Sequence, residues 1–207
     1  MSDQQSVFEI LDLSDLERGP RVQALYELGF TWADLEEEEY WMDAIAVMRS
    51  DIYKELEEAS AKLWDILDKA VRYIHLKRDL YELLGIPPVL WEMLDGSPIP
   101  EEGLISRYAR FDFAIAHDGT IKLLELNADT PTGYVEASIA TPWICEQAGV
   151  ASPNHAMKEQ LAAAWQIERP DTAACVAYGS HLEDSGTIEA LVRHSGLTIQ
   201  CVDCLDL

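Results

Sequence analysis

Residues 107–132 read RYARFDFAIAHDGTIKLLELNADTPT. Two strand-like segments, 105–115 and 121–127, lie on either side of a short polar stretch that contains Asp118 and Gly119. Asp-Gly between two such segments is a strong signal for a β-hairpin with a two-residue turn. We therefore predict an antiparallel hairpin with these two residues at the centre of its turn.

In that hairpin Asp112 lies opposite Glu125, and Arg110 lies opposite Asn127. All four side chains share one face, because side chains alternate along a strand. Two opposed carboxylates repel each other unless a positive charge lies between them. Mg²⁺ prefers oxygen ligands, and the guanidinium fork suits a phosphate or a carboxylate. The pattern predicts a magnesium-phosphate site for phosphoryl transfer, provided that a longer turn does not shift the register. The alternative is an exposed hairpin whose charged face points to water.

A polar segment follows the hairpin and leads into a predicted helix that Thr130 and Pro131 open. Thr130 and Thr132 would lie at the N-terminus of this helix, where hydroxyls and free backbone N–H groups attract anions. Plain helix capping is the alternative role for both threonines.

The spacing Arg110-x-Asp112, twelve residues, then Glu125-x-Asn127 resembles the metal-binding signature of ATP-grasp ligases. The continuation through Asn127-Ala-Asp-Thr-Pro-Thr, with Glu136-Ala after it, resembles the synthetase domain of glutathionylspermidine synthase and its bacterial relatives. The resemblance is specific over residues 104–143. It is looser around Tyr40-Trp41 and Leu182-Glu-Asp-Ser-Gly-Thr.

The resemblance implies an ATP-dependent ligase that forms an amide bond through an acyl phosphate. Its substrates would be a small carboxylate, glutathione or peptide-like, and a polyamine-like amine. Asp112, Glu125 and Asn127 would bind Mg²⁺ beside the co-substrate ATP, and Arg110 would be the catalytic residue that stabilises the transferred charge. Thr130 and Thr132 would bind the carboxylate substrate. They stand where the named enzyme has serines, which leaves the substrate itself open.

The family places its nucleotide-clamping lysines and a further phosphate-binding arginine well after the hairpin. After Lys122 this chain carries only Lys158, Arg169 and Arg193 as Lys or Arg, and none lies in a glycine-rich or lysine-strand context. We expect a fragment that binds magnesium-nucleotide weakly and does not turn over alone.

The rest of the chain predicts an α/β (α+β) fold in three regions. Residues 1–98 read as mainly helical, with helical spacing over 50–84 that fits one long helix or two. Residues 99–150 hold the hairpin of an ATP-grasp-like domain and the helices after it. Residues 151–207 read as a helix followed by β-α-β, the start of an open parallel sheet. Together these features predict an incomplete ATP-grasp fold with a permuted order of elements.

The charge of the chain limits its partners. Lys and Arg number 15 and Asp and Glu number 38, which gives a formal net charge of −23 at pH 7. Such a chain repels nucleic acid and anionic membrane surfaces. There is no long apolar run and no signal pattern at the N-terminus, so we expect a cytoplasmic protein without a membrane span. The oligomeric state is left open.

Two functions of other classes remain open from the sequence. The first is a non-catalytic acidic module, derived from the same family, that binds a partner protein through its charged, helical first hundred residues. The second is a different magnesium-dependent phosphotransferase, such as a kinase. A stable phosphorylated product in place of an amide would select the second.

Overall fold

The computed structural model describes residues 6–34, 40–101, 103, 105–106, 108–128, 132–168, 174–177, 179 and 181–206. Its α-helices are α1 (Arg18–Glu27), α2 (Ser50–Ile74), α3 (Arg78–Leu83), α4 (Trp91–Gly96), α5 (Thr141–Ala148), α6 (Met157–Glu168) and α7 (Leu182–Ser195). Its strands are β1 (Phe8–Asp12), β2 (Ala44–Met48), β3 (Arg110–Ile115), β4 (Ile121–Asn127), β5 (Ala174–Ala177) and β6 (Gln200–Asp203). Among the described helices, none has both the length and the apolar character needed to cross a bilayer.

The described strands form three two-stranded sheets, so the architecture is mixed α/β without a closed barrel. β1 and β2 are antiparallel and run from the pair Phe8–Met48 to the pair Asp12–Ala44. The sequence did not predict this pair, because its strands are short and more than thirty residues apart. β5 and β6 are parallel and α7 connects them, which confirms the predicted β-α-β unit.

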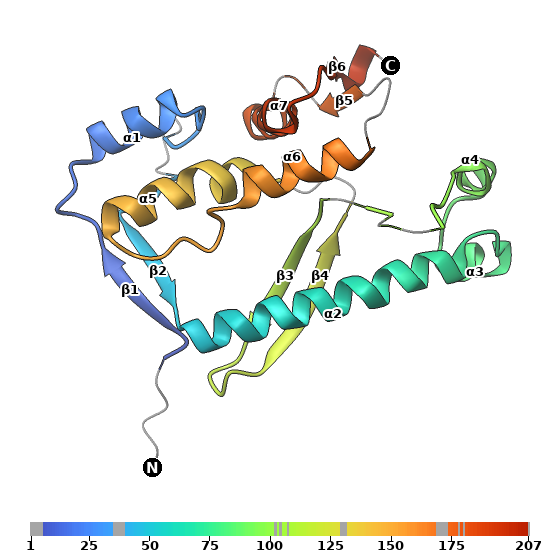
Figure 1. Cartoon of the computed structure of the whole chain (residues 1–207), viewed down its shortest axis with the longest axis horizontal. Coiled ribbons are helices and arrows are strands. Elements are labelled where there is room, and N and C mark those ends of the chain that lie inside the picture. The colour runs from blue at the N-terminus through green and yellow to red at the C-terminus, as the bar shows by residue number, and fades with distance from the viewer. Residues whose placement is uncertain are drawn as a thin grey trace.

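The helical spacing over residues 50–84 belongs to two helices. α2 ends at Ile74 and α3 begins at Arg78. Between them Leu76 takes a left-handed backbone conformation with φ 64°, and its amide donates to Tyr81 Oη at 2.9 Å. α2 runs along one side of the molecule, with the β3–β4 hairpin crossing it and α3 and α4 at its far end (Figure 1).

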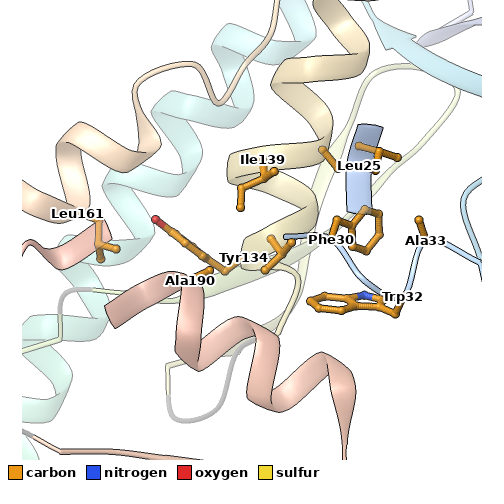
Figure 2. Packing of buried hydrophobic residues seen from close by; sticks show 10 residues of the cluster. Leu25, Phe30, Trp32, Ala33, Tyr134, Ile139, Leu161 and Ala190 are labelled. Atoms are coloured by element: carbon orange, nitrogen blue, oxygen red, sulfur yellow. The ribbon is translucent and has the colours of Figure 1, made fainter. Parts of the chain in front are cut away.

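One hydrophobic core connects segments that are far apart in the sequence. Leu25 of α1 and the segment Phe30–Ala33 pack against Tyr134 and Ile139, and Leu161 of α6 and Ala190 of α7 belong to the same cluster (Figure 2). The division of the chain near residues 98 and 150 stays a prediction, and this core contains residues from all three regions. The segment after the hairpin is therefore held between the N-terminal and C-terminal parts of the chain.

A wider helical turn precedes α5. Residues Glu136–Ala140 form the π-helical segment η2, which continues directly into α5. Pro142, in the first turn of α5, has no N–H and its ring crowds the carbonyl four residues earlier. A π turn accommodates that crowding, and such turns often occur at functional sites.

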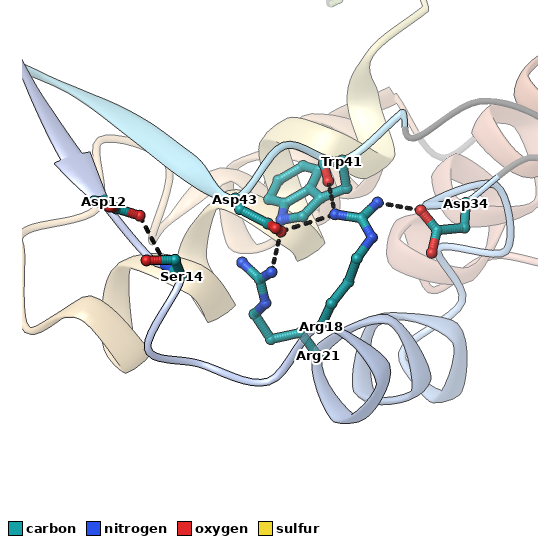
Figure 3. Close-up of polar contacts among 7 residues, drawn as sticks. All are labelled: Asp12, Ser14, Arg18, Arg21, Asp34, Trp41 and Asp43. Carbon is teal, nitrogen blue, oxygen red and sulfur yellow. Dashed lines mark hydrogen bonds and ion pairs between the residues drawn. The ribbon is translucent and has the colours of Figure 1, made fainter.

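Two arginines of α1 bind the segment that leads into β2. Arg21 is only 4% exposed and pairs with Asp43, and Arg18 also donates to Asp43 Oδ1, at 2.8 Å (Figure 3). Arg18 further pairs with Asp34 and donates to the carbonyl oxygen of Trp41 at 2.6 Å. These contacts lower the pKa of Asp43, mainly through its hydrogen bond with Arg21. They join α1 to the strand pair β1–β2.

The close approach of α7 to Trp32 gives a stability prediction. A Cβ at Gly186 would clash with the Trp32 ring at Cζ3, and the indole is held by an edge contact with Phe30 and a hydrogen bond to Glu136. Alanine in place of glycine normally stabilises a helix by about 0.5–1 kcal/mol. We expect Gly186→Ala instead to lower the free energy of unfolding by about 1–3 kcal/mol in urea denaturation, because the ring has to move.

The control is Gly96→Ala in α4, where a Cβ meets no atom within 4 Å. This variant should be as stable as the wild type or more stable. A Gly186→Ala protein that matches the Gly96→Ala protein would contradict the packing of α7 on Trp32.

Candidate functional site

The hairpin has the pairing that the sequence predicts, reached by a different turn. Arg110 pairs with Asn127, and Asp112 pairs with Glu125. The loop is longer than predicted: the amide of Ala116 donates to the carbonyl of Thr120, which leaves three residues between them, and β3 begins at residue 110 rather than 105. The register shifts between Asp112 and Phe113, where β4 carries one extra residue. This β-bulge offsets the extra loop residue, so the two carboxylates are opposed as expected.

The apolar face of the hairpin packs on α2. Phe111 stacks on Phe113 at 5.6 Å between ring centroids, and the edge of Trp64 in α2 meets Phe111 at 6.3 Å. At the loop Gly119 has φ 85° and lies close to Ile52, also in α2. Because side chains alternate along β3, Arg110 and Asp112 lie on the face turned away from α2.

An ion pair occupies part of that polar face. Arg110 Nε donates to Asp112 Oδ1 at 2.8 Å, and Nη2 donates to Oδ2 at 3.2 Å. The hydrogen bond from Arg110 holds the pKa of Asp112 below its usual value. The same bond raises the pKa of Arg110, and the charges of Asp112 and Glu125 add to that rise. Asp112 and Arg110 therefore both stay charged near neutral pH.

Arg110 also reaches the segment after the hairpin. Its Nη1 lies 3.5 Å from the carbonyl oxygen of Thr132, a half-buried residue just before the helical turn at Tyr134. Thr132 is therefore beside the polar face. Thr130 and the predicted helix start at Thr130-Pro131 lie outside the described residues, as does the acidic run 36–39.

The donor chemistry of this face fits a hard cation. Asp112, Glu125 and Asn127 offer carboxylate and amide oxygens from two neighbouring pairs of one hairpin. Within the described ranges the carboxylate of Glu125 makes no hydrogen bond or ion pair, so its oxygens are available, while its backbone is part of the β3–β4 ladder. No cluster of three or more Asp, Glu, His or Cys residues suited to a metal occurs in that part of the chain. The ligand set predicted from the sequence is not such a cluster, because it consists of two carboxylates and the amide of Asn127.

A family model described as glutathionylspermidine synthase preATP-grasp matches residues 14–204, which is most of the chain. The chain belongs to this family. The resemblance inferred from the hairpin and its continuation is thereby confirmed, and the mixed α/β architecture agrees with part of a preATP-grasp domain. The family is one of ligase-type enzymes.

Glu136 is a further polar residue near the site, and sequence analysis assigned it no role. Its Oε1 accepts hydrogen bonds from Trp32 Nε1 at 2.9 Å and from Tyr40 Oη at 3.1 Å, and its buried Oε2 has no hydrogen-bond partner among the described residues. Burial, followed by the Glu136 charge, raises the pKa of Tyr40 to about 12. The only signal in the sequence was the position of Glu136 shortly after the threonines.

Tyr108 connects the hairpin face with Glu136. It makes an edge contact with the buried Tyr134 ring at 5.5 Å between centroids. Burial raises the pKa of Tyr108 to about 12, and the charges of Arg110 and Glu136 act on it in opposite directions. Both charged residues therefore lie around one aromatic side chain.

Two of the basic residues that follow the hairpin in sequence lie around His194. Lys158 and Arg193 are both close to His194, whose pKa is lowered by burial and then by these two charges. Arg193 also lies against Gly29. Arg169 lies outside the described residues.

The ion pair on the hairpin gives a titration prediction. In Arg110→Gln the pKa of Asp112, followed by carbon NMR of the carboxyl group, should rise toward 3.8, because the hydrogen bond that lowers it is lost. The stability that this pair contributes in the wild type is present above the pKa of unfolded Asp. It is lost as pH falls through the lower native pKa.

Asp118 in the same hairpin is the control. Its pKa is lowered by the backbone amide of Thr120, so Arg110→Gln should leave its titration unchanged. If the titration midpoint of Asp112 were the same in the wild type and in Arg110→Gln, Arg110 would not control the pKa of this carboxyl group.

Proposed function

We propose that this chain carries the magnesium-phosphate site of an ATP-dependent carboxylate–amine ligase of the glutathionylspermidine synthase type. The observation that supports the proposal best is the opposed pair Asp112 and Glu125 beside Arg110. This group lies on the hairpin face turned away from α2, in a chain that belongs to a ligase-type family.

The reaction has two steps. A carboxylate oxygen of a glutathione-like or peptide-like substrate attacks the terminal phosphorus of ATP and releases ADP, which leaves an acyl phosphate. A polyamine-like amine then attacks the acyl carbon. The amine loses a proton and phosphate leaves, and an amide bond remains.

Each residue has a defined part in this proposal. Asp112, Glu125 and Asn127 would hold Mg²⁺, which when bound offsets the negative charge of the ATP phosphates. Arg110 is placed to stabilise the transferred phosphoryl group, since its guanidinium stays charged and its fork suits phosphate oxygens. Thr130 and Thr132 would bind the carboxylate substrate. The Arg110 contact with the Thr132 carbonyl supports a position for Thr132 beside the reacting groups.

The amine would be attracted by negative charge. The formal net charge of −23 draws cations toward the whole molecule, and Glu136 offers a partly buried carboxylate with one oxygen unused. Lys158 and Arg193 lie beside His194, and neither is in the glycine-rich or lysine-strand context of a nucleotide-clamping group. We therefore propose that this chain binds magnesium-nucleotide weakly and that turnover needs groups from outside the described residues.

Isothermal calorimetry tests the proposed site. Mg-ATP should bind the wild-type chain, and Asp112→Asn and Glu125→Gln should each weaken binding at least tenfold, since each removes one of two negative charges that hold the metal. Asp118→Asn, which changes a carboxylate in the hairpin loop, should bind like the wild type.

The absence of binding heat with the wild type would contradict the proposal, and so would equal affinity in Asp112→Asn. The first result would favour the acidic interaction module.

One observation supports this second function, binding to a partner protein. Apolar side chains around α3 and α4 are exposed, with Leu83 80%, Val89 85% and Met93 62% accessible.

A further inference from the structure

A concave site is lined by residues of the β1–β2 pair and α5 and by no described residue of the hairpin. Figure 1 shows where β1, β2 and α5 lie in the fold. The site is a cavity of about 460 Å³, within the range of small-molecule sites in proteins. Phe8 and residues 45–48 of β2 line one part of it, Ile144 and Cys145 of α5 another, and residues 150–153 a third. The last segment is linked to α2, because Tyr53 Oη donates to the carbonyl of Pro153 at 3.4 Å.

Among the described residues, those that line this cavity include no Asp, Glu, Lys, Arg or His. That is unusual in a chain of which 26% of the residues are charged. Its polar side-chain groups are neutral: the hydroxyls of Ser50, Tyr53, Thr141 and Ser152, the indole N–H of Trp41 and the thiol of Cys145. Burial raises the pKa of the Cys145 thiol and of the Tyr53 phenol, so neither becomes charged near neutral pH.

We infer that this cavity is a binding site for an uncharged, largely apolar small molecule. Transfer of a charged group into a lining without a countercharge costs free energy, because the group loses its water and gains no partner. Apolar contact with Phe8, Met48 and Ile144 favours hydrocarbon or aromatic surface. The neutral hydroxyls allow one or two hydrogen bonds that orient the ligand.

This site differs from the proposed ligase site in the ligands that it accepts. ATP, a carboxylate substrate and a polyamine all carry charge, so none of them suits the cavity. Its ligand would bind without magnesium and without dependence on Asp112 or Glu125. An experiment that disproves one of the two sites therefore does not disprove the other.

The neutral fluorophore N-phenyl-1-naphthylamine is the probe for this site. Its fluorescence should rise on binding to one site per chain, with or without Mg²⁺. The anionic 8-anilinonaphthalene-1-sulfonate and the cationic thioflavin T should each bind at least tenfold more weakly, because the cavity offers neither a countercharge. Equal binding of the three dyes, or no binding of the neutral one, would overturn the inference without the use of any variant.

Variants locate the probe. Ala46 and Ala151 line the cavity and are exposed, so Ala46→Phe and Ala151→Phe add bulk at its edge without disturbing the core. Each should weaken binding of the neutral probe at least fivefold at an unchanged melting temperature. Ala61→Phe, at an exposed position of α2 outside the cavity, is the matched control and should bind like the wild type. Wild-type affinity in both cavity variants would place the probe elsewhere and overturn the assignment.

Discussion

Two like charges held opposite each other on one hairpin are the constraint on which the polar face depends. Asp112 of β3 and Glu125 of β4 are directly cross-strand paired. Two opposed carboxylates lower the stability of the fold unless a positive charge offsets their repulsion. Arg110 offsets part of the charge through two hydrogen bonds to Asp112. The carboxylate of Glu125 has no hydrogen bond or ion pair among the described residues, although its charge acts on Arg110. A hard cation would supply the partner that this carboxylate lacks.

The rest of the fold fixes the register that this pairing needs. A slip by one residue would turn Asp112 toward α2 and Phe111 toward the polar face. The contact between Trp64 and Phe111 opposes that slip. Behind the hairpin, Tyr134 is fully buried and its hydroxyl lies 2.8 Å from His194 Nδ1, which holds the segment after β4 against α7. The polar face is thus positioned from α2 on one side and from the core on the other.

Local patterns in the sequence predicted the elements whose causes are local. The hairpin and the β-α-β unit both follow from spacing and turn residues, and the pairing of Asp112 with Glu125 was predicted correctly. The two-residue turn was wrong, and the bulge on β4 compensated for it without any signal in the sequence. The β1–β2 pair and the contact of Trp32 with Glu136 join residues far apart in the chain, and single-sequence periodicity does not reveal such contacts. The role of each site residue stays a proposal.

Paramagnetic NMR with Mn²⁺ in place of Mg²⁺ tests the central claim most directly. Broadening from a bound ion is confined to its surroundings, so it separates a defined site from diffuse attraction to an acidic surface. We predict that the amides of residues 110–112 and 125–127 broaden first, at manganese concentrations that leave the rest of the chain unaffected. Broadening that begins elsewhere, or that spreads evenly over the acidic surface, would contradict a metal site on this hairpin.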